Sequence, residues 1–243
     1  MNRRPANGAR NARALPKGVS TLGRLMTWQL LLTGIIVCVR HPSFAAEIRG
    51  RVLDENGQGL GQAVVFVQEM PAGVVAGGGS AGGEHTAIMD QIHKQFVPHV
   101  LAVTVGTKVY FPNHDQIHHH VYSFSRTKTF EIPLYKGETA PPVPFDRVGA
   151  VKVGCNIHDW MSAVIVVVPT PYYATTDETG AFVISDLPAG RYSVACWHEG
   201  SRVNVDETVQ KIDVSNHAPE ATFTLTVAPV PSRPPGHGVR EYE

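Results

Sequence analysis

Short runs of alternating apolar and polar residues dominate the chain from residue 48 onward. Residues 48–54 (IRGRVLD) alternate, residues 55–62 (ENGQGLGQ) have turn chemistry, and residues 63–70 (AVVFVQEM) form a β-branched apolar run. Alternation with a period of two, bounded by Gly, Asn and Asp, is typical of β-strands joined by turns. The pattern therefore predicts two strands around a turn in residues 48–70.

The same pattern of short β-rich runs separated by turns continues in residues 86–168 and 171–227. Residues 86–168 contain the β-rich runs VYSFS, AVKVGC and MSAVIVVVP, punctuated by Pro and Gly. Residues 171–227 contain three expected strands separated by Asp-Glu-Thr-Gly and Leu-Pro-Ala-Gly turns, followed by the runs KIDVSN and ATFTLTV. Because no stretch shows sustained helical periodicity, the sequence predicts an all-β fold.

The first 46 residues have the pattern of a targeting segment. A lead rich in Arg and Lys precedes the apolar run 25–39 (LMTWQLLLTGIIVCV), and a small-x-small pattern follows at residues 43–46 (SFAA). The run is shorter than the roughly 20 residues of a membrane-spanning helix, and its length is typical of a signal-peptide core. We therefore expect a signal peptide over 1–46, export to the periplasm and no stable membrane span in the mature protein. An uncleaved anchor is the alternative.

Composition narrows the class of protein. Hydrophobic residues make up 43% of the 243 residues and charged residues 17%, which is enough apolar material for a core. Lys plus Arg and Asp plus Glu both number 21, so we expect no nucleic-acid partner, which would require a basic face. The Gly-rich segment 71–85 is expected to be a linker, and the Pro-rich segment 228–243 a disordered tail.

Two separated pieces of the chain resemble one known domain. Residues 50–65 read G-x-V-x-D-x-x-G-x-x-L followed by A-V-V, residues 176–184 read T-D-x-x-G-x-F-x-I, and residues 187–192 read L-P-A-G-x-Y. These motifs resemble the carboxypeptidase regulatory-like (transthyretin-like) β-sandwich. The resemblance implies that residues 47–70 and 171–227 form one such sandwich.

About a hundred residues separate the two pieces, the size of a small domain. We therefore expect a second domain, residues 86–169, inserted into a loop of the first, since loop-closure entropy grows slowly with length. The alternative is two sandwiches in series, which would leave residues 48–70 as an isolated and marginal hairpin.

The expected inserted domain carries a distinctive group of sulfur and imidazole side chains. Residues 154–161 read GCNIHDWM, which places Cys155, His158 and Met161 at the spacing C-x2-H-x2-M. Upstream, Asn113 is followed by three consecutive histidines, and His119 lies at the spacing N-x5-H. This pattern resembles the cupredoxins, most closely the amicyanin and plastocyanin-like group. It is also similar to exported proteins, some labelled methylamine-utilisation proteins.

The resemblance implies a Greek-key β-sandwich with one type 1 (blue) copper. Its implied ligands are His119, Cys155, His158 and Met161, with Asn113 tying the ligand loops together. Two histidines and a cysteine in a trigonal plane with a weak axial methionine are the ligands of such sites. Residues 118 and 120 of a strand share one face and 119 the other, so only one of these faces can supply the ligand. His119 is favoured, and His118 or His120 in its place is the alternative.

The resemblance also implies a function. A protein of this kind would be a one-electron carrier between redox proteins, such as a c-type cytochrome or a periplasmic dehydrogenase, and not an enzyme. Two alternatives are a copper-handling protein and a metal-free structural module. Cys196 is expected to be a buried free thiol in the outer sandwich. Trp160 is expected either to lie at a docking face or to pack in the core.

Overall fold

The computed structural model describes residues 46–74, 85–137, 140–215 and 219–228, all within one compact unit, Pro42–Glu243. The expected signal peptide apart from Ala46, most of the expected linker and nearly all of the expected tail lie outside the described residues. The regular elements of the described part are seventeen β-strands and one short 3-10 helix, η1 (Val205–Thr208). The prediction of an all-β fold is confirmed. No helix in the described ranges is long and apolar enough to cross a membrane.

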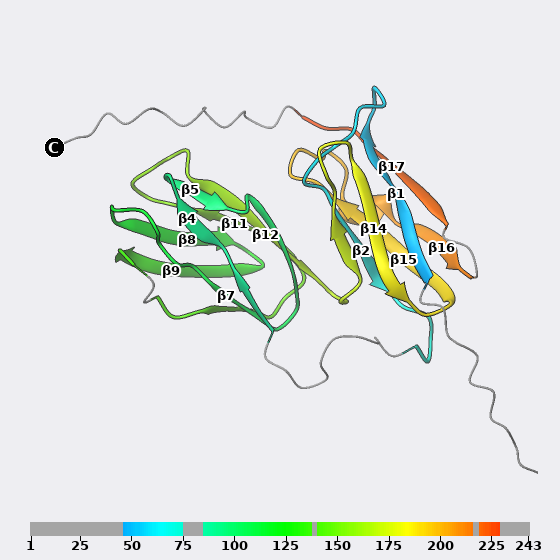
Figure 1. Cartoon of the computed structure of the whole chain (residues 1–243), viewed down its shortest axis with the longest axis horizontal. Coiled ribbons are helices and arrows are strands. Elements are labelled where there is room, and N and C mark those ends of the chain that lie inside the picture. The colour runs from blue at the N-terminus through cyan, green and yellow to red at the C-terminus, as the bar shows by residue number, and fades with distance from the viewer. Residues whose placement is uncertain (1–45, 75–84, 138–139, 216–218, 229–243) are drawn as a thin grey trace, which may run out of the picture. The chain divides into compact units, whose positions relative to one another are not determined.

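Strands from the two ends of the described chain share two sheets and one core (Figure 1). The first sheet has the order β14-β1-β17, and the second has the order β13-β2-β15-β16. The strands are β1 (Ala46–Asp54), β2 (Val64–Glu69), β13 (Tyr173–Thr175), β14 (Ala181–Leu187), β15 (Gly190–Trp197), β16 (Gln210–Val214) and β17 (Glu220–Leu225). Thus β1 pairs with strands that follow it by more than 120 residues.

The strands between residues 86 and 168 form a second set of sheets around a separate core. The largest sheet has the order β6-β12-β11-β8-β9, beside a sheet β10-β7-β3 and a hairpin β4-β5. The strands are β3 (Thr86–Ile88), β4 (Asp90–Ile92), β5 (Gln95–Val97), β6 (Val100–Thr104), β7 (Thr107–Tyr110), β8 (His119–Ser125), β9 (Lys128–Tyr135), β10 (Val143–Phe145), β11 (Gly149–Gly154) and β12 (Ser162–Val168).

The continuous apolar runs in β2 and β12 have a structural reason. In β12, Ile165 and Val167 pack in the core of residues 86–168, whereas Val164 and Val166 face a third buried cluster. That cluster also takes in Phe66 of β2, whose neighbours in the strand face the other core. Because successive side chains of a strand point to opposite faces, both strands are buried on both sides and cannot alternate with polar residues.

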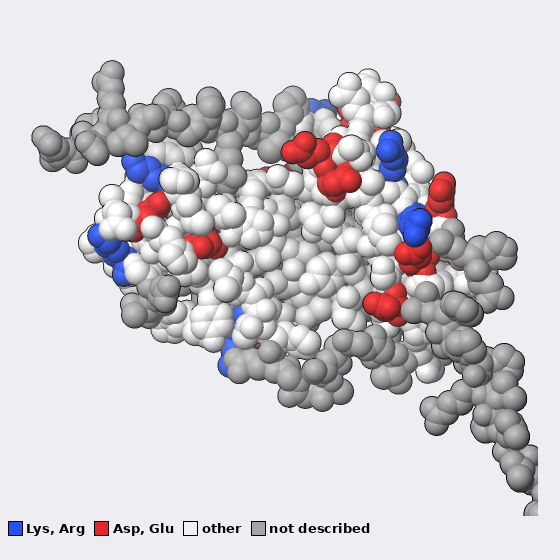
Figure 2. All heavy atoms as spheres, in the orientation of Figure 1, with Lys and Arg blue, Asp and Glu red and all other residues white. Residues whose placement is uncertain are grey.

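Charges of both signs occur together on the face of the molecule that Figure 2 shows. On the face that Figure 2 shows, the basic and acidic side chains of the described residues are interspersed around a broad uncharged area. This agrees with the equal numbers of basic and acidic residues in the chain.

Candidate metal centre

The loop between β11 and β12 folds into a tight turn around Cys155. The backbone N–H of Cys155 donates to the carbonyl of Met161 at 3.1 Å, and the N–H of Met161 donates to the carbonyl of His158 at 2.9 Å. Cys155 and Met161 are 3% and 1% exposed and belong to the same core cluster. The turn therefore brings together the three predicted residues that are close in sequence.

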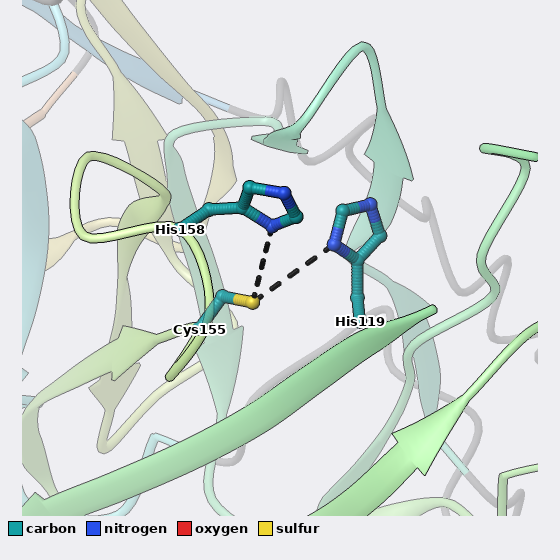
Figure 3. A group of neighbouring side chains, drawn as sticks. All are labelled: His119, Cys155 and His158. Carbon is teal, nitrogen blue, oxygen red and sulfur yellow. Dashed lines mark hydrogen bonds between the residues drawn. The ribbon is translucent and has the colours of Figure 1, made fainter. Parts of the chain in front are cut away.

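His119 reaches the same point from another strand. It is the first residue of β8, which lies beside β11 in the sheet, with Tyr122 paired to Gly154. The Nδ1 atoms of His119 and His158 lie 3.9 and 3.7 Å from the Sγ atom of Cys155. Figure 3 shows both rings with Nδ1 turned toward the sulfur. The three donor atoms lie within 4.8 Å of one another, a spacing that could hold one metal ion.

The side chains of His118 and His120, the histidines on either side of His119 in the sequence, are not brought to Cys155. The His119 side chain is fully buried, whereas His118 is exposed. The Nε2 atom of His120 lies 2.8 Å from the carboxylate of Glu131, a residue of β9. Of the three consecutive histidines, the structure therefore brings His119 to Cys155.

Asn113 supports the loop that carries His119. Its side-chain amide donates to the carbonyls of Ile117 and Tyr135, both at 3.0 Å, and its Oδ1 accepts the N–H of Asp115 at 3.0 Å. These bonds brace the loop before β8 against β9. A bond from Asn113 to the loop of Cys155 stays a prediction.

The electrostatics at Cys155 and His158 favour the protonation states that bind metal. Burial opposes charge on the Cys155 thiol, but hydrogen bonds from His119 and from the backbone of His120 and Ile157 outweigh it and lower the pKa of Cys155. Burial and the neighbouring His119 lower the pKa of His158, which favours the neutral imidazole. Thiolate and neutral imidazole are the forms that ligate metals.

The effects on the pKa of His119 add up in the opposite direction. Burial disfavours its charged form, but contacts with Cys155 and Asp115 outweigh burial and raise the pKa of His119. A bound cation would have to displace any proton from its Nδ1 atom, as metal binding generally does.

Sequence reasoning missed Asp115. Its Oδ2 atom lies 2.7 Å from Nε2 of His119, on the side of the ring that faces away from Cys155. A spacing of four residues predicts a side-chain contact on a helix, but this segment is an irregular loop, so the spacing did not indicate that Asp115 contacts His119. The only signal for it in the sequence was its place between Asn113 and His119.

The donor set fits copper. Thiolate and thioether are soft ligands that suit Cu(I), and imidazole also suits copper, so two imidazoles and one thiolate with a buried thioether on the same turn fit a copper site. A closed tetrahedral zinc site of structural type would instead use four Cys or His ligands. The described residues bring three such donors together here.

Among the comparisons with known proteins, only the one with solved structures found similarities. No family model and no curated protein matches the chain. An oxidised amicyanin variant is 23% identical, over 33% of this chain and 79% of that one, with a TM-score of 0.31. A purple cupredoxin from Nitrosopumilus maritimus is 22% identical, over 35% of this chain and 99% of that one, with a TM-score of 0.30.

A copper-containing nitrite reductase from Thermus scotoductus is also similar. It is 23% identical, over 39% of this chain and 24% of that one, with a TM-score of 0.33. These structural neighbours are thus cupredoxins and a copper enzyme. At these TM-scores the similarities carry no argument about activity, so the residues of the site have to support any proposal.

Proposed function

We propose that residues 86–169 are a cupredoxin domain that holds one type 1 copper and works as a one-electron carrier. The observation that supports this is the convergence of the Nδ1 atoms of His119 and His158 on the Sγ atom of Cys155. Copper would supply the redox couple. His119, Cys155, His158 and Met161 would hold it, since two imidazoles, a thiolate and a thioether are the ligands of type 1 copper.

The sandwich that surrounds this site suits electron transfer. Cys155, Met161 and His119 are buried at the ends of strands that pack in one core. Ligands fixed by a packed core move little when the charge of the metal changes. A carrier of this kind rearranges no bonds of a substrate, and we propose that the protein is not an enzyme.

The proposal extends to the rest of the chain. Residues 47–70 and 171–227 would be a transthyretin-like sandwich into which the cupredoxin domain is inserted, as their shared core supports. Residues 1–46 would be a signal peptide that directs the protein to the periplasm. The redox partner would be a c-type cytochrome or a periplasmic dehydrogenase.

The loop that carries His158 exposes two apolar side chains beside the polar Asn156 and Asp159. Ile157 and Trp160 flank His158 and are 49% and 43% exposed, and the Trp160 ring lies 5.4 Å from that of His158. Half-buried His158 therefore approaches solvent between two exposed apolar side chains. A redox partner would dock at this end of the domain.

The visible spectrum tests the proposed centre. The chain from Ala46 onward, loaded with Cu(II), is expected to show an intense thiolate-to-copper band. The Cys155→Ser variant is expected to lack the band because it has no thiolate ligand. A pale wild-type protein with weak copper absorption would show that no type 1 site forms.

The second candidate function is copper handling, favoured by the further histidines that are close to His119 in sequence, His114, His118 and His120. A handling protein would give up its metal readily, so rapid loss of copper to a mild chelator would support it over electron transfer. A protein that binds no copper would instead be a structural module.

A further inference from the structure

The hairpin β4-β5 packs against the loop that leads to His119. The N–H of Gln91 donates to the carbonyl of Pro112 at 3.1 Å, and the N–H of His114 donates to the carbonyl of Gln91 at 3.0 Å. Gln91 is fully buried, and its side-chain amide donates to the carbonyls of Phe111 and Pro112. The hairpin is therefore held along the segment that ends at Asp115.

The turn of this hairpin has an unusual backbone. His93 and Lys94, its two central residues, have positive φ values of 53° and 58°. Two-residue turns with both φ values positive normally use Asn and Gly, because other residues pay a steric cost in this region. Residues held in such conformations require support from their surroundings.

Asp115 provides that support. Its Oδ1 accepts the N–H of His93 at 2.7 Å, and its Oδ2 accepts the N–H of Lys94 at 2.8 Å. The same Oδ2 lies 2.7 Å from Nε2 of His119. One carboxylate with 12% of its side chain exposed thus joins the strained turn to the buried imidazole.

We propose that Asp115 is a positioning residue that fixes the tautomer and orientation of His119, and that the β4-β5 turn holds this carboxylate in place. A proton on Nε2, donated to Asp115, leaves the lone pair of Nδ1 directed at the space between His119, Cys155 and His158. The part of this proposal that concerns copper rests on the proposed function. The part that concerns the imidazole does not.

The carboxylate also sets the preference of the centre for one oxidation state. A negative partner on the far nitrogen makes the imidazole a stronger electron donor, which favours Cu(II) over Cu(I). Removal of such a partner typically weakens metal affinity by about 10- to 100-fold. If the variant loses affinity mainly for Cu(II), the reduction potential rises. Each tenfold difference between the losses of Cu(II) and Cu(I) affinity raises it by about 59 mV.

The experiment uses Asp115→Asn in the chain from Ala46 onward. Without metal, at pH 8, nitrogen NMR of the wild type is expected to show the Nε2–H tautomer of His119, with slow exchange of the His93 and Lys94 amides. The variant is expected to lose the single tautomer and to exchange these amides faster. With copper, its Cu(II) affinity is expected to fall by about 10- to 100-fold and its potential to rise.

The control is Glu131→Gln, which removes the carboxylate beside the neighbouring His120 and leaves His119 untouched. It is expected to match the wild type in all measurements. An Asp115→Asn protein that keeps the Nε2–H tautomer and the slow amides would overturn the proposal. If the wild type binds no copper, the proposed function fails, but the tautomer and exchange measurements still decide the role of Asp115.

Discussion

At the scale of single residues, the chain places its two described cysteines in opposite environments. Cys155 lies against two imidazoles, which lower the pKa of its thiol. Cys196 lies in the core shared by β1 and β15, with apolar neighbours, and burial raises the pKa of its thiol to about 12. The sequence-based expectation that Cys196 is a buried free thiol is confirmed.

Cys196 is therefore expected to be chemically inert in the folded protein. In the Cys155→Ser background, starting at Ala46, iodoacetamide at pH 8 should modify Cys196 only as fast as the protein unfolds, because the reactive thiolate is scarce and enclosed. Mass spectrometry with and without urea measures this. Modification in native buffer at the rate of a small free thiol would contradict the burial.

At the scale of elements, the buried hydroxyl of Thr176, the residue after β13, connects the end of this strand to the turn after β1. The Oγ1 atom of Thr176 accepts the N–H of Ala63 at 2.9 Å and donates to the carbonyl of Leu60 at 2.6 Å. The Thr176 residue is 5% exposed. The two backbone groups are 113 and 116 residues away in sequence, so this contact closes the sandwich between its two distant pieces.

Thr176→Val is expected to destabilise the protein by about 1–3 kcal/mol. The valine has the same shape, but it removes the partner of the buried N–H of Ala63 and of the part-buried carbonyl of Leu60. Urea unfolding measures the loss, and Thr175→Val is the matched control because Thr175 is exposed on β13. Equal stability of the two variants would show that water or a backbone shift replaces the hydroxyl.

At the scale of the whole molecule, a polar contact joins residues that belong to the two sets of sheets. The imidazole of His99, just before β6, lies 2.7 Å from the carboxylate of Glu199, just after β15. The other ring nitrogen of His99 lies 3.0 Å from the carbonyl of Ser162. The contact with His99 and the charge of Lys152 outweigh burial and hold the pKa of Glu199 below its usual value of 4.5.

This contact makes stability depend on pH. Since the pKa of Glu199 is lower in the folded state, its contribution is present above about pH 4.5 and is lost as the pH falls through the folded-state pKa. Glu199→Gln is therefore expected to be less stable than the wild type at pH 6, with a difference that shrinks toward pH 3. Thermal unfolding between pH 3 and 6 measures this, with Glu178→Gln as the control for an exposed carboxylate. A difference that stays constant with pH would exclude the carboxylate as its cause.

Local sequence determined much of this protein. Alternation and β-branched runs predicted the strands, because a half-buried strand must alternate and a strand buried on both faces, such as β12, must be apolar throughout. The spacing C-x2-H-x2-M requires Cys155, His158 and Met161 to lie on one turn. Strand geometry likewise predicted that His119 and His120 face opposite ways, as consecutive residues of β8.

Tertiary structure decided the rest. His119 and Cys155 are 36 positions apart in the sequence, and this separation does not predict that they meet. Only the pairing of β8 beside β11 brings them together. Which face of β8 points inward also depends on that pairing. The role of Asp115 depends on a hairpin turn more than 20 residues earlier in the chain. Hydrophobic alternation in the sequence shows which faces of a strand are buried, but not which strands pair. A site built from loops that are distant in sequence forms only when the sheets that carry these loops have packed.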